Sequence, residues 1–152
     1  MATINIYVSK IANSGQLSLR LGTAIPGTPD DPDNDTLVAG VDPSDTVRWS
    51  VDQHPDPGRN NNLTLVHVKA AIPAPGPYLN SQQLLENAEY SAEYTPDPMG
   101  VITATVLATP PPAKPGEAKA FENYQIGYFQ SFPPPTDPTV PETWDDPRLQ
   151  MN

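Results

Sequence analysis

The stretch "DTVRWSV", Asp45 to Val51, alternates apolar and polar side chains at every second position. In an extended chain, Val47, Trp49 and Val51 lie on one face and the polar residues between them on the other. This alternation is typical of a β-strand that buries one face against a hydrophobic core. We therefore predict that Trp49 lies in the core and anchors a sheet.

The same two-residue period recurs in most apolar runs of the chain. A change of phase within residues 63–68 indicates a bulge or a strand buried on both faces, and residues 37–41 are a weaker candidate. About eight strands at this spacing predict an all-β fold, an antiparallel β-sandwich. The other candidate strands are residues 4–8, 17–21, 90–94, 102–106 and 124–128.

One segment departs from the β pattern. The stretch "NSQQLLENAEY", residues 80–90, has Ser81 as a candidate N-cap, good helix formers after it and no β-branched residue. These features predict one or two helical turns within a connection between strands.

The quoted stretch resembles an early core strand of cupredoxin-like and immunoglobulin-like β-sandwiches. In those families a turn aspartate precedes a strand whose large inward aromatic residue joins the two sheets, and Asp45 and Trp49 stand at the matching positions. The resemblance implies the same sandwich. Blue-copper cupredoxins bind their metal through two histidines, a cysteine and usually a methionine. The chain has no cysteine, so Met99 cannot complete that set and no copper site is expected.

Proline punctuates the chain, with 21 prolines among 152 residues against an average of about 5%. Most prolines lie between the apolar runs, where a missing N–H does no harm. Aspartate accepts backbone N–H groups and proline presets φ, so the Asp-Pro dipeptides predict turns. The dipeptides begin at Asp31, Asp42, Asp56, Asp97, Asp137 and Asp146.

The last 20 residues carry six prolines and no strand alternation. We therefore expect the chain to divide into a β-sandwich domain, residues 1–132, and a proline-rich C-terminal arm, residues 133–152.

The chain is acidic, with 18 Asp plus Glu against eight Lys plus Arg and a net charge of −10. Such a charge repels phosphate backbones and anionic lipids, so neither nucleic acid nor a membrane surface is an expected partner. The N-terminus lacks the pattern of a signal peptide, and no run approaches the ~18 apolar residues of a membrane span. We expect a cytoplasmic protein, or one released without a cleaved signal peptide.

The stretch "PDDPDNDT", residues 29–36, imitates the start of a calcium-binding loop. Counted from Asp31, however, Thr36 replaces the glycine of the sixth position, and Asp42 replaces the bidentate glutamate of the twelfth. The pattern therefore favours a solvated turn, and we expect no cofactor. The alternative is a calcium site at one end of the sandwich. Its candidate ligands are Asp31, Asp33, Asp35, and Asp42 or Asp45.

The motifs of common catalytic sites are missing. The two histidines are His54, in a turn, and His67, in a strand with apolar neighbours, where a hydrogen-bonded structural role is expected. There is no Gly-x-Ser-x-Gly turn, no phosphate-binding glycine loop and no His-Glu-x-x-His. We do not expect an enzyme.

Three side chains in proline-rich segments are candidates for partner binding. Strand alternation does not bury Tyr78 or Trp144, and Trp144 and Leu149 are candidate anchors by which the arm docks on the sandwich or on a neighbouring copy. We expect a non-catalytic structural or self-associating module that binds other copies, as a homo-oligomer, or a protein partner through its surface and arm. The alternative is a calcium-assisted carbohydrate-binding (lectin-like) module that uses the aspartate loop and an exposed Tyr or Trp.

Overall fold

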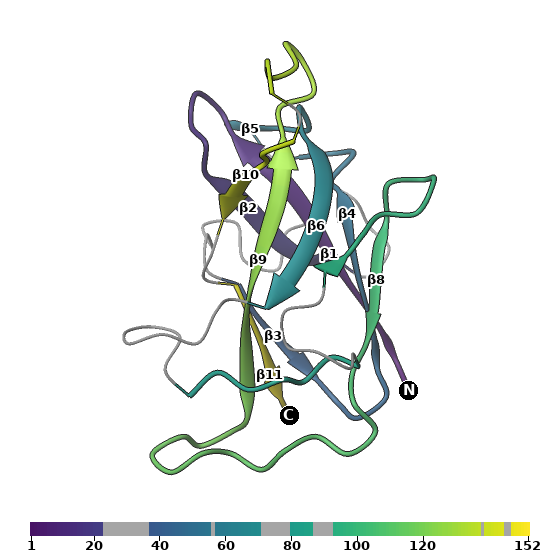
Figure 1. Ribbon diagram of the computed structural model, residues 1–152, viewed down its shortest axis with the longest axis vertical. Coiled ribbons are helices and arrows are strands. Elements are labelled where there is room, and N and C mark those ends of the chain that lie inside the picture. Colours follow the sequence, from purple (N-terminus) through teal and green to yellow (C-terminus); the bar gives the residue numbers. More distant parts are fainter. Residues whose placement is uncertain (23–36, 56, 71–79, 87–92, 138, 145–146) are drawn as a thin grey trace.

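The computed structural model describes residues 1–22, 37–55, 57–70, 80–86, 93–137, 139–144 and 147–152. These residues form eleven β-strands in two sheets, and the part of the chain that is described contains no helix. The sheets face each other (Figure 1). The prediction of an all-β sandwich is confirmed.

The first sheet has the strand order β2-β1-β4-β8, and the short β5 pairs with β1. β1 and β2 are antiparallel neighbours joined by a short turn, whereas β1 and β4 run parallel with Ile6 opposite Trp49. The strands are β1 (Thr3–Ile11), β2 (Leu17–Gly22), β4 (Thr46–Val51), β5 (Arg59–Asn60) and β8 (Ile102–Thr105).

The second sheet has the order β3-β11-β9-β6-β7, with β10 also paired to β9. A register shift between Leu65 and His67 confirms the bulge that the change of phase predicts. The strands are β3 (Val38–Val41), β6 (Thr64–Ala70), β7 (Glu93–Tyr94), β9 (Phe121–Phe129), β10 (Glu142–Trp144) and β11 (Arg148–Met151).

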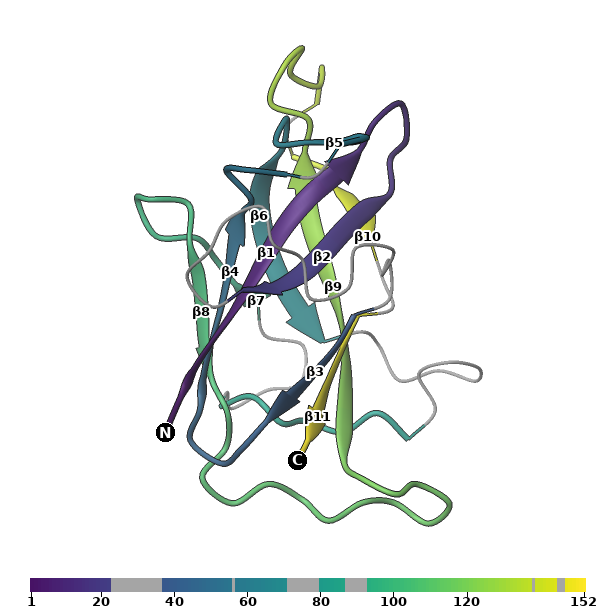
Figure 2. The same cartoon turned by 180° about the vertical axis from the view of Figure 1, so that it is seen from behind.

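Both sheets are mixed rather than purely antiparallel. β1 and β4 are parallel, and so are β3 and β11, which lie side by side in Figure 2. Parallel neighbours need a crossover connection. Between β1 and β4 the chain passes through the opposite sheet as β3, and this excursion returns β4 to the first sheet in the same direction as β1.

The core lies between the two sheets and is centred on aromatic side chains. Trp49 of β4 is fully buried, and its ring packs edge-to-face with that of Tyr124 of β9, with centroids 5.4 Å apart and an interplanar angle of 68°. An edge-to-face pair of this kind adds about 0.5–1.5 kcal/mol to the burial of the two rings. Trp49 thus joins the sheets, as its place in the alternating stretch predicts.

Asp45 fastens the strand that carries Trp49. Its buried carboxylate accepts the backbone N–H of Ala2 at 2.7 Å and that of Asp42 at 2.9 Å. Its carbonyl accepts the N–H of Val106, just beyond β8, at 2.8 Å. One aspartate therefore connects the start of β1, the turn before β4 and the end of β8.

The helix expected over residues 80–90 is wrong for residues 81–86, which are extended. Leu85 bridges to Val106, and the Glu122 carboxylate accepts the N–H groups of Leu84 at 2.6 Å and Leu85 at 3.1 Å. Both leucines are buried in the core. Tertiary hydrogen bonds and burial therefore replace those of a helix and override the local propensity. Residues 87–90 lie outside the described residues.

The C-terminal segment contributes strands to the second sheet, although its sequence shows no alternation. β10 pairs with β9, and β11 lies between β9 and β3. Leu149 is fully buried, and Trp144 packs against the core from its edge. Arg148–Met151 contains no proline, so each of its residues keeps the N–H that a sheet requires.

We predict that Trp49→Ala lowers the free energy of unfolding by about 3–5 kcal/mol, because the substitution removes a fully buried ring and leaves a cavity. Chemical denaturation followed by circular dichroism measures this loss. Trp144→Ala is the matched control and should cost less, because this ring is only partly buried. Equal stabilities of Trp49→Ala and the unmodified protein would contradict the assignment.

A second prediction concerns pH, because burial raises the pKa of Glu122 from 4.5 to about 7, and its two backbone hydrogen bonds offset this effect only in part. The folded state therefore holds the proton more tightly than the unfolded state. The resulting stability is complete below about pH 4.5 and is lost as the pH rises through 7, so the free energy of unfolding should fall by about 2–3 kcal/mol between pH 5 and pH 8.

In Glu122→Gln this pH-dependent part should disappear, whatever the variant's stability at a single pH. Urea denaturation across the pH range measures the two slopes. Glu86→Gln, at an exposed carboxylate on the same segment, is the control and should retain the slope of the unmodified protein. Parallel slopes for Glu122→Gln and the unmodified protein would show that Glu122 does not titrate in this range.

Candidate functional site

The acidic residues that could form a cation site are only partly described. Asp31, Asp33 and Asp35 lie outside the described residues. Asp42 is exposed, and both carboxylate oxygens of Asp45 already accept backbone N–H groups. No group of three His, Cys, Asp or Glu side chains suited to a metal ion occurs among the residues that are described.

The two histidines lie in different parts of the sandwich and are not brought together. His54 is exposed in the turn after β4, whereas His67 of β6 lies on the outer face of the second sheet, opposite Gly127 of β9. Its Nδ1 is 3.9 Å from the carboxylate of Glu93. Burial lowers the pKa of His67 below 6.5, although Glu93 acts in the opposite direction.

The imidazole of His67 packs directly on the backbone of Gly127. A Cβ at this glycine would overlap the His67 ring. The ring therefore covers a bare stretch of β9, as aromatic side chains do where they shield a glycine in a sheet. This contact supports a structural role for His67 through packing. The hydrogen bond expected for its ring is not found, because the buried Nε2 has no hydrogen-bond partner among the described residues.

We predict that Gly127→Ala destabilises the protein by about 1–3 kcal/mol, because the new methyl group displaces the His67 ring. In a His67→Ala background the same substitution should cost much less, so a double-mutant cycle measured by denaturation should show coupling. Gly15→Ala, where a Cβ would make only an ordinary contact, is the control. Equal costs in the two backgrounds would contradict the packing assignment.

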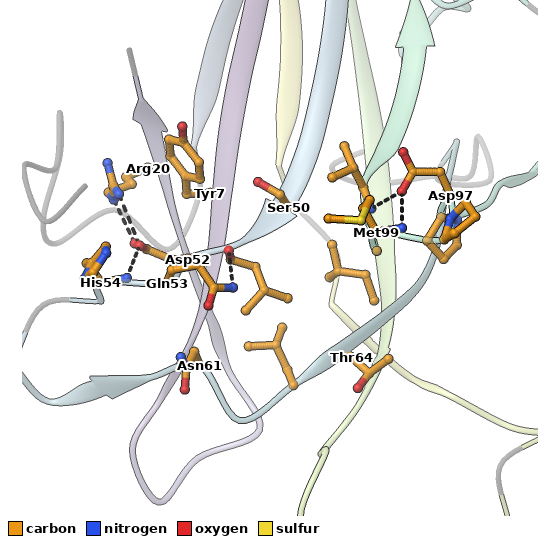
Figure 3. A pocket seen from close by; sticks show the side chains of 17 residues that line it. Tyr7, Arg20, Ser50, Asp52, Gln53, His54, Asn61, Thr64, Asp97 and Met99 are labelled. Carbon is orange, nitrogen blue, oxygen red and sulfur yellow. Dashed lines mark hydrogen bonds and ion pairs between the residues drawn. The ribbon is translucent and has the colours of Figure 1, made fainter. Parts of the chain in front are cut away.

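An open groove of about 820 Å³ lies where β4 ends and β6 begins, beside the turn that leads into β8 (Figure 3). Polar side chains and apolar side chains both line it. The polar ones include Ser50, Gln53, His54, Asn61 and Thr64, and the apolar ones include Leu63, Leu65, Pro96, Pro98, Met99 and Val101.

One wall of the groove is fixed by a buried ion pair. Arg20 of β2 binds Asp52 through Nε at 2.7 Å and Nη2 at 3.1 Å, and both side chains are almost fully buried. The guanidinium also lies 4.5 Å from the ring centre of Tyr7. Burial alone would raise the pKa of Asp52, but the hydrogen bond and charge of Arg20 outweigh it and hold this pKa below its usual value. Asp52 therefore stays charged and paired.

Asp52 also positions the turn that follows it. Its Oδ1 accepts the N–H of His54 at 3.0 Å. The pair of Arg20 and Asp52 thus holds the turn bearing Gln53 and His54 at the mouth of the groove (Figure 3). A bidentate pair of this kind fixes the relative orientation of its two side chains. Because the two charges neutralise each other, the pair can be buried.

The opposite rim is the turn before β8. The Asp97 carboxylate accepts the N–H groups of Met99 at 2.8 Å and Val101 at 3.0 Å, and its carbonyl accepts that of Gly100 at 2.9 Å. Gly100 has φ +81°, a conformation that glycine adopts without strain. The Asp-Pro signal predicts this turn. The turn presents Met99, which is 85% exposed, at the rim.

Beside the groove, a proline-rich connection leaves the body of the sandwich between β9 and β10 (Figure 1). We call residues 131–141 the proline loop, of which residue 138 is not described. The described residues up to 140 are exposed, and Phe132 and Val140 keep 78% and 68% of their surface exposed.

The base of the proline loop is held by hydrogen bonds. The Asn62 side chain donates to the carbonyl of Phe132 at 2.6 Å and accepts its N–H at 2.8 Å. The hydroxyls of Thr64 and Ser131 are 2.8 Å apart. Asn62 is therefore used as a clamp, which sequence analysis missed because its partner lies 70 residues away.

Two of the three residues expected to bind a partner are buried or partly buried in the chain's own core. Leu149 is fully buried in the core of the sandwich to which it belongs, and Trp144 packs against that core. Tyr78 lies outside the described residues. Among the described residues from 131 onward, the exposed large apolar side chains are Phe132 and Val140. The run of three prolines after Phe132 is the signal that could have identified this loop.

Comparison of the chain with models of known protein families and with curated proteins gives no match. In the residues that the structure covers, no helix has the length and apolar character needed to cross a membrane.

Proposed function

We propose that the protein is a non-catalytic, self-associating β-sandwich module whose C-terminal segment binds other copies of the chain. The observation that supports this proposal best is the proline loop, which carries two exposed apolar side chains on a hydrogen-bonded base. Large apolar side chains that project from an exposed loop can serve as anchors of a protein interface.

Proline makes the loop suited to association. Its restricted φ reduces the freedom of the unbound loop, so less entropy is lost when the loop is fixed at an interface. The clamp by Asn62 adds to this preorganisation, because the carbonyl and the N–H of Phe132 are both already bonded. The side chain of Phe132 can therefore be buried without ordering the backbone that bears it.

A non-catalytic role agrees with the use of the charged side chains near the groove. Arg20 and Asp52 neutralise each other, and Asp97 is bonded to the backbone of its own turn. Each of these groups stabilises a local conformation and leaves little chemistry for a substrate.

The alternative is a calcium-assisted carbohydrate-binding module. The polar lining of the groove favours it, because the side chains of Gln53, Asn61 and Thr64 could bond sugar hydroxyls. In this alternative, Asp31, Asp33 and Asp35 would bind the calcium ion together with the exposed Asp42. Such a module should respond to chelators, whereas association through the proline loop should not.

We predict a mass above that of the monomer in light scattering after size-exclusion chromatography, rising with protein concentration and unaffected by EDTA. The combined substitutions Phe132→Ser and Val140→Ser should weaken association by about tenfold or more, since each removes apolar surface from the interface. At a concentration at which both proteins are monomeric, the melting temperature should not fall, because both side chains are exposed in the monomer. Val38→Ser, at a half-exposed valine on β3, is the matched control.

Salt gives an independent test of the same proposal. Two copies that each carry a charge of −10 repel one another. Salt screens this repulsion, and at 0.1 M the screening length is about 10 Å. Association should therefore strengthen as salt is added. A monomeric mass at all concentrations and salt levels would overturn the proposal, as would unchanged association of the double variant.

A further inference from the structure

The groove and the proline loop share one rim. Thr64 lines the groove, and its hydroxyl bonds that of Ser131 at the base of the loop. Asn61 also lines the groove, and the next residue, Asn62, clamps Phe132. The concave site (Figure 3) and the base of the projecting loop therefore lie next to each other.

The proline loop is held away from the groove of its own chain. It projects beyond the ends of β6 and β9 (Figure 1), and the two hydrogen bonds between Asn62 and Phe132 fix the direction in which it leaves β9. None of the described residues of the loop lines the groove. The groove is thus open to the loop of another molecule.

The chemistry of the two surfaces is complementary. Phe132 and Val140 are apolar projections, and the groove offers apolar contact at Met99, whose side chain is 85% exposed. Proline-rich segments present backbone carbonyls without competing N–H groups, and they bind grooves that combine apolar surface with side-chain donors. Asn61 is such a donor in the lining of the groove.

We infer that the groove of one copy receives the proline loop of a second copy, and that the second copy returns the contact, so that association stops at a two-fold symmetric dimer. This inference rests on the proposed function. A loop and a groove at the same end of one molecule can be paired twice by a single two-fold axis, which closes the assembly. Two such contacts also bring the interface closer to the roughly 1,200–2,000 Å² of specific complexes than one contact does.

The test uses one variant that lacks a functional loop and one that lacks a functional groove. The loop variant carries Phe132→Ser and Val140→Ser. The groove variant carries Met99→Glu, which replaces an exposed apolar side chain by a charge that repels the acidic loop with its Asp137. Val38→Glu makes the same change of charge on β3, away from the groove, and serves as the control.

At a concentration at which the unmodified protein is a dimer, each variant alone should be a monomer by native mass spectrometry, and Val38→Glu should remain a dimer. An equimolar mixture of the loop and groove variants should regain a heterodimer, because the first supplies an intact groove and the second an intact loop. The heterodimer should bind at least about tenfold more weakly than the unmodified dimer, since one of its two contacts is missing.

The outcomes separate this inference from the proposed function. A groove variant that still dimerises, a mixture without heterodimer, or unmodified protein that grows beyond the dimer would overturn the reciprocal contact and leave self-association standing. Unmodified protein that stays monomeric would overturn both, and so would a loop variant that associates normally.

Discussion

The contact between Trp49 and Tyr124 sets the position of the two sheets relative to each other. It joins β4, at the centre of the first sheet, to β9, the strand to which β6, β10 and β11 are all paired. Tyr128 lies further along β9, and its hydroxyl donates a hydrogen bond to the carbonyl of Gly15. This bond attaches the turn between β1 and β2 to the second sheet. β9 therefore contacts both sheets and the turn between β1 and β2. The end of β4 and the start of β6 meet at the groove.

Buried acidic side chains stabilise the connections around this core. Asp45 binds the start of β1, Asp52 binds Arg20 and the following turn, and Glu122 binds the extended segment at Leu84 and Leu85. Each carboxylate replaces hydrogen bonds that an irregular backbone cannot make with itself. The partners of these groups are backbone N–H groups and the guanidinium of Arg20, so each group connects segments that lie apart in the sequence.

In the C-terminal segment, the positions of proline correlate with which residues join the sheet and which stay exposed. Residues 148–151, without proline, enter the second sheet between β3 and β9 and bury Leu149. Residues 142–144 also pair with β9, whereas the described residues of the proline loop up to 140, where prolines lack the N–H that a sheet requires, remain exposed. A single segment thereby fastens itself to the sandwich at one end and presents Phe132 and Val140 at the other.

The sequence by itself determined what depends on neighbouring residues: the strand alternation, the inward position of Trp49, and the turns at Asp42, Asp97 and Asp137, where side-chain or backbone oxygens of each aspartate accept nearby N–H groups. Only the tertiary structure decided the parallel pairs, the extended path at Leu84 and Leu85, and the candidate site. The groove requires Arg20 to meet Asp52 across 32 residues, and the proline loop requires Asn62 to meet Phe132 across 70. Local patterns carry no information about such contacts, because their energy is gained only after the strands between them have been arranged.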